Sequence, residues 1–227
     1  MKENLITKYW LPVLSLALFI AGLYLVFLYV PTEASMGVVQ RIFYFHVPVA
    51  WVAFLAFFIV FIGSILYLWK RDDRWDRLAA ASAEIGVIFT TLVLITGSIW
   101  ARPAWGVWWT WEPRLTTALV LWFIYAAYLL IRSYAPEESR GARFAAVIGI
   151  VGFIDVPIVF LAIVLWRTQH PSPVIFEGGL EGSMLLTLMV CLAAFTTLYV
   201  TLLRLRMHLR KVEKVIKIFE SEKENPA

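Results

Sequence analysis

Cysteine is almost absent from this chain of 227 residues, which contains only Cys191. A single thiol excludes a framework of disulfides within the chain. The lack of a Cys-x-x-Cys-His motif excludes covalently attached c-type haem on it. Histidine is nearly as scarce, with three residues. A site built on imidazole therefore has few candidates, and each can be considered individually.

Charge is missing from long stretches of the sequence. Hydrophobic residues make up 61% of it and the mean hydropathy is +0.78, whereas soluble domains are about 45–50% apolar. Apolar runs near 20 residues indicate membrane-spanning helices, because barrel strands would alternate in short segments. The sequence predicts an all-α integral membrane protein, a single domain over residues 1–227. Its six transmembrane helices are expected near Tyr9–Val30, His46–Trp69, Ala83–Trp100, Leu115–Tyr134, Phe144–Trp166 and Met184–Leu203.

Lysine and arginine are unevenly distributed, which predicts the orientation of these spans. The tails and the two loops on their side carry 16 of the 20 cations, and the three opposite loops carry Arg41, Arg102, Arg114 and Arg167. Cytoplasmic loops are enriched in Lys and Arg, so we expect both termini to be cytoplasmic. The first span is not followed by a small-residue cleavage pattern, so we do not expect a cleavable signal.

The C-terminal tail, residues 204–227, is basic and contains His208. We interpret this tail as a cytoplasmic surface that meets anionic membrane lipid. A basic amphipathic helix there would also suit the docking of partner subunits. The net charge of +4 then reflects topology and gives no indication of nucleic-acid binding.

Two of the three histidines fall in the external loops. The first loop, PTEASMGVVQRIFYFHVP, ends at His46, and the third, RTQHPSPVIFEGGLEG, contains His170. Between them lies a tryptophan-rich segment, residues 100–116, which includes WGVWWTWEPRLT. Five of the chain's 11 tryptophans fall within 12 residues of this segment: Trp100, Trp105, Trp108, Trp109 and Trp111.

Two interpretations of these tryptophans remain open. Tryptophan favours the headgroup region, and an aromatic belt accounts well for Trp10, Trp51, Trp69 and Trp166. It accounts less well for the tryptophan-rich segment, since spacings of three, one and two residues put rings on both sides of any helix. We predict a short external interfacial helix that carries the segment. Some rings would rest on the bilayer, and others would offer a stacking platform to a flat apolar ligand.

The external histidines also allow two interpretations. A lone interfacial histidine is usually a polar residue at the headgroups, but two that flank an aromatic segment suit a planar metallocofactor. Haem iron takes axial imidazole ligands, and loops far apart in sequence can approach one porphyrin from opposite faces. Zinc would need three or four ligands, and Glu112, Glu177 and Glu181 show no zinc spacing. Arg41 and Arg114 are external cations that could pair with haem propionates.

The segment WGVWWTWEPRLT resembles the signature W-G-x-W-W-x-W-D-x-R-L-T of the tryptophan-rich (WWD-domain) haem-handling superfamily of cytochrome c biogenesis. Within it, the chain length, the six spans and one external histidine on each side of the motif resemble the haem exporter protein C (CcmC) family. The stretch QRIFYFHVP resembles that family too. The resemblance covers essentially the whole chain. One departure is Glu112, which replaces the usual aspartate and lengthens the reach of the carboxylate.

The resemblance implies a specific function. Members hold haem b non-covalently at the outer surface of the cell inner membrane and promote its transfer to the membrane-anchored haem chaperone CcmE. They work beside the CcmA/CcmB ABC transporter and the small membrane protein CcmD. By position, His46 and His170 would be the axial ligands of the haem iron, and the five tryptophans would form the platform and the edge that docks the chaperone. Glu112 and Arg114 would complete the motif of a transfer protein that is not an enzyme.

Two functions from other classes compete with this one. A haem lyase of the CcsA type would attach haem to apocytochrome c, but the short chain and only two external histidines argue against it. An ion-coupled transporter would be built around Asp155, because intramembrane acids are costly. It would need more than one such acid and paired broken helices. Pro157 offers Asp155 a structural explanation, because the proline frees a backbone carbonyl and kinks the helix. Glu84 lies near the cytoplasmic end of its span, where its carboxylate can reach water, and we interpret it as structural.

Overall fold

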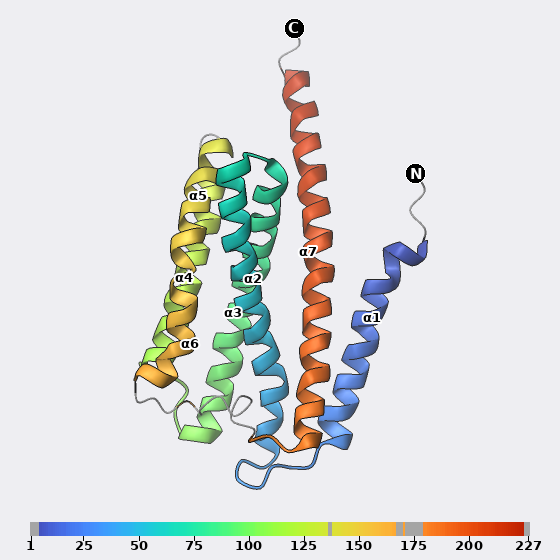
Figure 1. Ribbon diagram of the computed structural model, residues 1–227, viewed down its shortest axis with the longest axis vertical. Coiled ribbons are helices and arrows are strands. Elements are labelled where there is room, and N and C mark those ends of the chain that lie inside the picture. The colour runs from blue at the N-terminus through green and yellow to red at the C-terminus, as the bar shows by residue number, and fades with distance from the viewer. Residues whose placement is uncertain (1–4, 136–137, 167–169, 171–178, 225–227) are drawn as a thin grey trace.

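Figure 1 shows the computed structural model, which describes residues 5–135, 138–166, 170 and 179–224. The described chain folds into a helical bundle, and six of its helical stretches are long and apolar enough to cross a membrane. This confirms the predicted all-α membrane fold. The helices are α1 (Leu5–Tyr24), α2 (Phe43–Lys70), α3 (Asp73–Trp105), α4 (Pro113–Tyr134), α5 (Glu138–Gly152), α6 (Asp155–Leu165) and α7 (Gly182–Glu224), with α5 and α6 forming one span.

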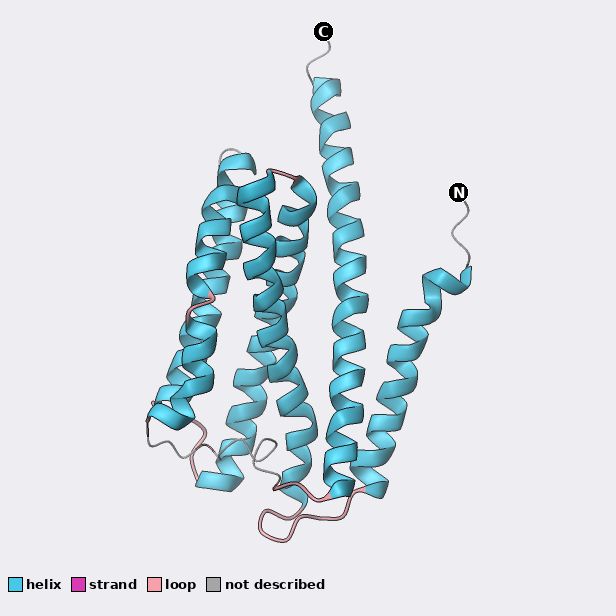
Figure 2. Ribbon diagram, viewed as in Figure 1, coloured by secondary structure: helices cyan, strands magenta, loops and turns pink. Residues whose placement is uncertain are grey.

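Both described ends of the chain point to the same end of the bundle (Figure 1). This end also carries the turn between α2 and α3, and we call it the terminal end. The opposite end, which we call the motif end, carries the connections from α1 to α2 and from α3 to α4, together with the end of α6 and the start of α7 (Figure 2). The tryptophan-rich segment therefore lies at the other end of the bundle from the basic tail.

The core is arranged around α2, which contacts α3, α5 and α7. Phe57 of α2 stacks on Tyr125 of α4, with ring centroids 3.7 Å apart and planes 12° from parallel. Helices in membranes approach closely where their contact residues are small, and α3 supplies buried small residues along Ala79–Ala83 and at Gly86. A Cβ atom on Gly86 would lie only 2.5 Å from the Phe57 ring, so this glycine makes room for that stack.

The fifth span is interrupted where the sequence predicts a kink. Proline has no N–H, so Pro157 cannot donate to the carbonyl of Phe153 one turn earlier. The backbone instead makes tighter bonds from Val156 N to Phe153 O and from Ile154 N to Val151 O, both 3.1 Å. The span is thus divided into α5 and α6, and Asp155 begins the second helix. Its buried Oδ2 has no hydrogen-bond partner in the described chain.

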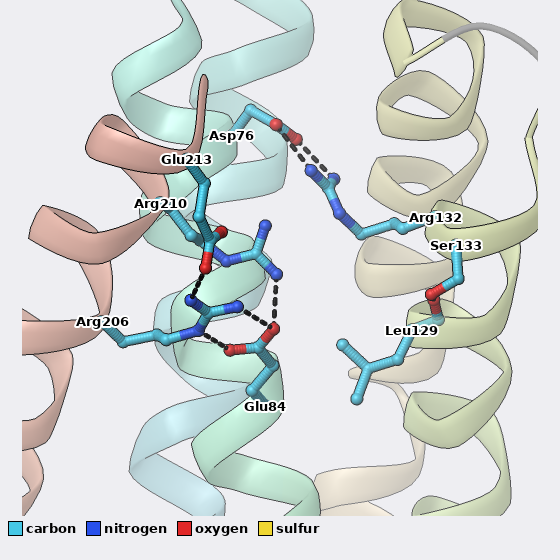
Figure 3. Close-up of polar contacts among 8 residues, drawn as sticks. All are labelled: Asp76, Glu84, Leu129, Arg132, Ser133, Arg206, Arg210 and Glu213. Carbon is cyan, nitrogen blue, oxygen red and sulfur yellow. Dashed lines mark hydrogen bonds and ion pairs between the residues drawn. The ribbon is translucent and has the colours of Figure 1, made fainter. Parts of the chain in front are cut away.

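Ion pairs join the helices at the terminal end (Figure 3). Arg132 of α4 donates two hydrogen bonds, of 2.6 and 2.7 Å, to the Asp76 carboxylate of α3, and both side chains are largely buried. Glu84, which was expected to be structural, accepts from both Arg206 and Arg210 of α7. Glu84 therefore has a structural role, because it ties the last helix to α3.

We predict that Gly86→Ala destabilises the bundle, since the new methyl group would collide with the stacked Phe57 ring. Overpacking of this kind costs about 1–3 kcal/mol. The midpoint of thermal unfolding of the detergent-solubilised protein should fall. Gly22→Ala is the matched control, because its Cβ would meet Cys191 Sγ at an ordinary 3.4 Å. Equal midpoints for the two variants would show that Phe57 moves aside without cost.

Candidate functional site

A cavity opens at the motif end, with walls from α2, α3, α4 and α6. The space that its walls outline, which includes the opening to solvent, is about 930 Å³. Most of its lining is apolar, including Phe54, Val93, Leu115 and Val159. Such a cavity suits a large apolar ligand held in place by a few polar groups.

Six of the predicted site residues line this cavity: His46, Trp100, Trp105, Trp109, Arg114 and His170. The other four do not line it. Trp108 and Trp111 have exposed fractions of 58% and 75%, and Glu112 lies at the start of α4 outside the lining set. Arg41 donates from Nη1 to the carbonyl of Phe27 at 2.9 Å, so it ties the first connection to the end of the first span.

His46 lies in the second turn of α2 and is held by α3. Its Nδ1 is 2.8 Å from the hydroxyl oxygen of Thr96, and its ring meets the Trp100 ring edge-on, with centroids 5.7 Å apart. Gly97 leaves space for the ring, since a Cβ there would lie 3.2 Å from Cε1 of His46. These contacts occupy the Nδ1 side of the imidazole and leave Nε2 as the nitrogen for a ligand.

His170 comes from the connection between α6 and α7 and meets Trp105 with ring centroids 6.4 Å apart. It lines the same cavity as His46, although 124 positions separate the two in the sequence. The structure therefore brings the two predicted imidazoles to one cavity. Arg167 and Glu177, which the sequence analysis also named on this loop, lie outside the described residues.

The tryptophan-rich segment does not form the short interfacial helix that we predicted. Gly106 adopts a left-handed conformation (φ 80°) and ends α3, as glycine commonly does just after a helix. Pro113 then begins α4, where its fixed φ suits the first helical position. The six residues 107–112 form an irregular connection between the two helices. Turn chemistry at the two ends of the motif thus outweighs any helical tendency of the residues between them.

This connection sorts the tryptophan rings into two groups. Trp100 and Trp105, on the last turns of α3, and Trp109 in the connection face the cavity. Trp108 and Trp111 point their rings outward, as their exposed fractions show. One short segment can therefore contact a ligand on one side and a membrane or partner on the other.

Several buried polar atoms beside the cavity have no hydrogen-bond partner in the described chain. They are Nη1 of Arg114 and the indole nitrogens Nε1 of Trp100 and Trp109. Buried donors are nearly always satisfied in folded proteins, so this set of donors fits a ligand that brings anionic oxygens. Within the described ranges, no group of three or more His, Cys, Asp or Glu side chains is placed to hold a metal ion. Two imidazoles suit a metal that brings its own equatorial ligands.

The first connection contributes a residue that the sequence analysis missed. Met36 lines the cavity and follows a tight turn made by Glu33. The backbone N–H groups of Met36 and Ser35 donate to the Glu33 carboxylate, and these bonds lower the pKa of Glu33 below its ordinary value. Gly37 closes the turn with a positive φ of 62°. This turn places Met36 against the cavity.

Thr96 and Gly97 were missed as well, although the sequence carried a signal for them. The stretch TGS, residues 96–98, interrupts an apolar span with three small or polar residues. Such residues in transmembrane helices mark close contacts and interhelical hydrogen bonds. That signal alone does not identify the partner, which is 50 positions away on α2.

The fold and cavity define a class: a polytopic membrane protein whose tryptophan motif and two histidines frame one apolar cavity. Comparison of the sequence with known families assigns the chain to one family within that class. The sequence profile described as Heme exporter protein C matches residues 3–220. The chain therefore belongs to the Heme exporter protein C (CcmC) family.

Individual relatives agree with this assignment. Heme exporter protein C of Bradyrhizobium diazoefficiens is 39% identical over 196 residues, which are 85% of this chain and 74% of that protein. A putative cytochrome c biosynthesis ccmC-like mitochondrial protein of Marchantia polymorpha is 32% identical over 77% of this chain and 75% of its own. Heme exporter protein C of Escherichia coli K12 is 29% identical over 87% of this chain and 81% of its own.

Proposed function

We propose that this protein binds haem b non-covalently at the motif end and delivers it to the haem chaperone CcmE during cytochrome c maturation. The observation that carries the proposal is the single cavity that collects His46, His170, Arg114 and three tryptophans. The names of its relatives, which refer to haem export and cytochrome c biosynthesis, support the same function.

The residues at the cavity have distinct roles in this proposal. His46, through Nε2, and His170 are the axial ligands of the haem iron. Arg114 binds a propionate by charge-assisted hydrogen bonds, which would satisfy its buried Nη1. The tryptophan rings contact the porphyrin face and edge through apolar and stacking interactions. None of these contacts is covalent, so the haem can leave.

The outward-facing rings of Trp108 and Trp111 form the surface on which the chaperone docks. Haem and chaperone then meet at one place, because the same short connection carries Trp109 at the cavity wall. We place the motif end on the periplasmic face of the inner membrane. There the protein works beside the CcmA/CcmB ABC transporter and the small protein CcmD.

The first test of this function concerns the two histidines. His46→Ala and His170→Ala should each lower the haem content of the purified protein and replace its bis-histidine spectrum with that of a mono-ligated iron. The cause is the loss of one axial nitrogen in each variant. His208→Ala is the control, since His208 lies on α7 between Arg206 and Arg210, which pair with Glu84 at the terminal end. Wild-type haem content and spectrum in either cavity variant would refute that ligand assignment.

A second test separates haem transfer from haem binding. Trp108→Ala and Trp111→Ala should slow the transfer of haem to the purified chaperone while leaving the axial-ligand spectrum unchanged, because these rings face outward. Trp105→Ala and Trp109→Ala should reduce haem retention, because these rings line the cavity. Trp69→Ala removes an equally exposed ring at the terminal end and serves as the control. Normal transfer by the Trp108 and Trp111 variants would exclude them as the docking surface.

The proposed orientation can be tested by labelling single cysteines in a Cys191→Ala background. Ser35→Cys lies in the exposed first connection at the motif end, and Ser139→Cys lies on an exposed position of α5 at the terminal end. A membrane-impermeant maleimide should label Ser35→Cys in intact spheroplasts and Ser139→Cys only after permeabilisation. The reverse pattern would place the cavity on the cytoplasmic side.

A further inference from the structure

The hydroxyl of Thr96 contacts partners on two helices. Its oxygen lies 2.7 Å from the carbonyl oxygen of Leu92, with a longer 3.4 Å contact to that of Val93, so the hydroxyl donates to its own helix. The same oxygen lies 2.8 Å from Nδ1 of His46. A hydroxyl has one proton, and here that proton is committed to the backbone. With that proton on the backbone, Nδ1 is left as the donor in this contact, which assigns the proton of the neutral imidazole to Nδ1.

The same arrangement occurs twice more in the spans, at places where the direction of the bond is certain. Thr91 donates to a carbonyl one turn earlier at 2.8 Å and lies 2.8 Å from Nε1 of Trp122. Thr196 donates to its own helix at 2.7 Å and lies 3.1 Å from Nε1 of Trp51. An indole nitrogen can only donate. In these spans, a threonine thus keeps its proton on its own helix and accepts a ring N–H from a neighbouring helix.

The rest of the His46 environment fixes the orientation of the ring. Gly97 makes room for the Cε1 edge, which a Cβ at that position would approach to 3.2 Å. Trp100, one turn further along α3, meets the ring at an interplanar angle of 71°. With Nδ1 and Cε1 against α3, Nε2 is the ring nitrogen left for the cavity that His46 lines.

We propose that Thr96 is a positioning residue that holds His46 in its Nδ1–H tautomer, so that the Nε2 lone pair is presented to the iron. This inference rests on the proposed haem-binding function. A histidine that ligates a metal needs its other nitrogen protonated and oriented by a partner, and loss of such a partner typically lowers metal affinity about 10- to 100-fold. The hydrogen bond also raises the basicity of Nε2, which favours ferric over ferrous haem.

The test compares Thr96→Val, which removes the hydroxyl but keeps the branched shape, with Thr96→Ser, which keeps the hydroxyl. Ferric haem is titrated into the purified full chain, and the spectrum and reduction potential are recorded. Thr96→Val should bind haem about 10- to 100-fold more weakly, with a mixed-spin spectrum and a more positive potential. Thr96→Ser should match the wild type. Thr96→Ala also lacks the hydroxyl and should show the same weaker binding. The test therefore stands even if the valine of Thr96→Val disturbs folding.

Two controls distinguish a failure of the axial-ligand assignment from a failure of the role proposed for Thr96. Thr91→Val removes a hydroxyl with the same bonding pattern from the same helix, and it should leave haem binding unchanged. If His46→Ala binds haem as the wild type does, the axial-ligand assignment of the proposed function is wrong. If His46→Ala loses the ligand but Thr96→Val and Thr96→Ala keep wild-type affinity, spectrum and potential, only the role of Thr96 is overturned.

Discussion

In the hydrocarbon of a membrane no water is present, so every backbone and side-chain polar group needs a partner within the protein. Most of this structure follows from that constraint. It explains why the spans are helices, and why their threonines donate to carbonyls of the preceding turn. It also accounts for Ser82, buried among α2, α3 and α7, which donates to the Ala56 carbonyl and hydrogen-bonds the Tyr199 hydroxyl. Most charged side chains are accordingly placed toward the bundle ends, as ion pairs at one end and as Arg41 and Arg114 at the other, whereas Asp155 lies within a span.

The same constraint gives the cavity a rigid frame. His46, Trp105 and Arg114 lie on early or final turns of long helices, whose hydrogen bonds and small-residue contacts fix their relative positions. Sites built on helices are held more accurately than sites on loops. His170 differs, because it lies on a connection. The two proposed ligands are thus unequal: α3 fixes the ring of His46, whereas His170 completes the site from a connection outside the helical frame.

Hydropathy predicted the six spans because the bilayer imposes their length and composition, and the kink at Pro157 followed from the missing N–H. The two histidines and the tryptophan motif could be named from residue type and position alone. What could not be predicted depends on tertiary placement. Glu84 pairs with arginines more than 120 positions away, and Arg41 donates to the backbone carbonyl of Phe27 in the first span. The helix expected in the tryptophan segment failed because Gly106 and Pro113 determine local geometry more strongly than ring spacing does.

In the proposed function, the density of tryptophan in this connection would follow from the need to hold a ligand and release it. A covalent bond, or a cavity closed on all sides, would hold a flat apolar ligand too firmly for transfer. Aromatic contact supplies a large area without directional bonds, so it is lost gradually as the ligand slides toward an acceptor. Because Trp108 and Trp111 face outward beside Trp109, an acceptor could cover the exposed rings while the ligand still touches the rings that line the cavity. The ligand would then remain shielded from water during transfer, and the proposed axial histidines would determine when the iron is released.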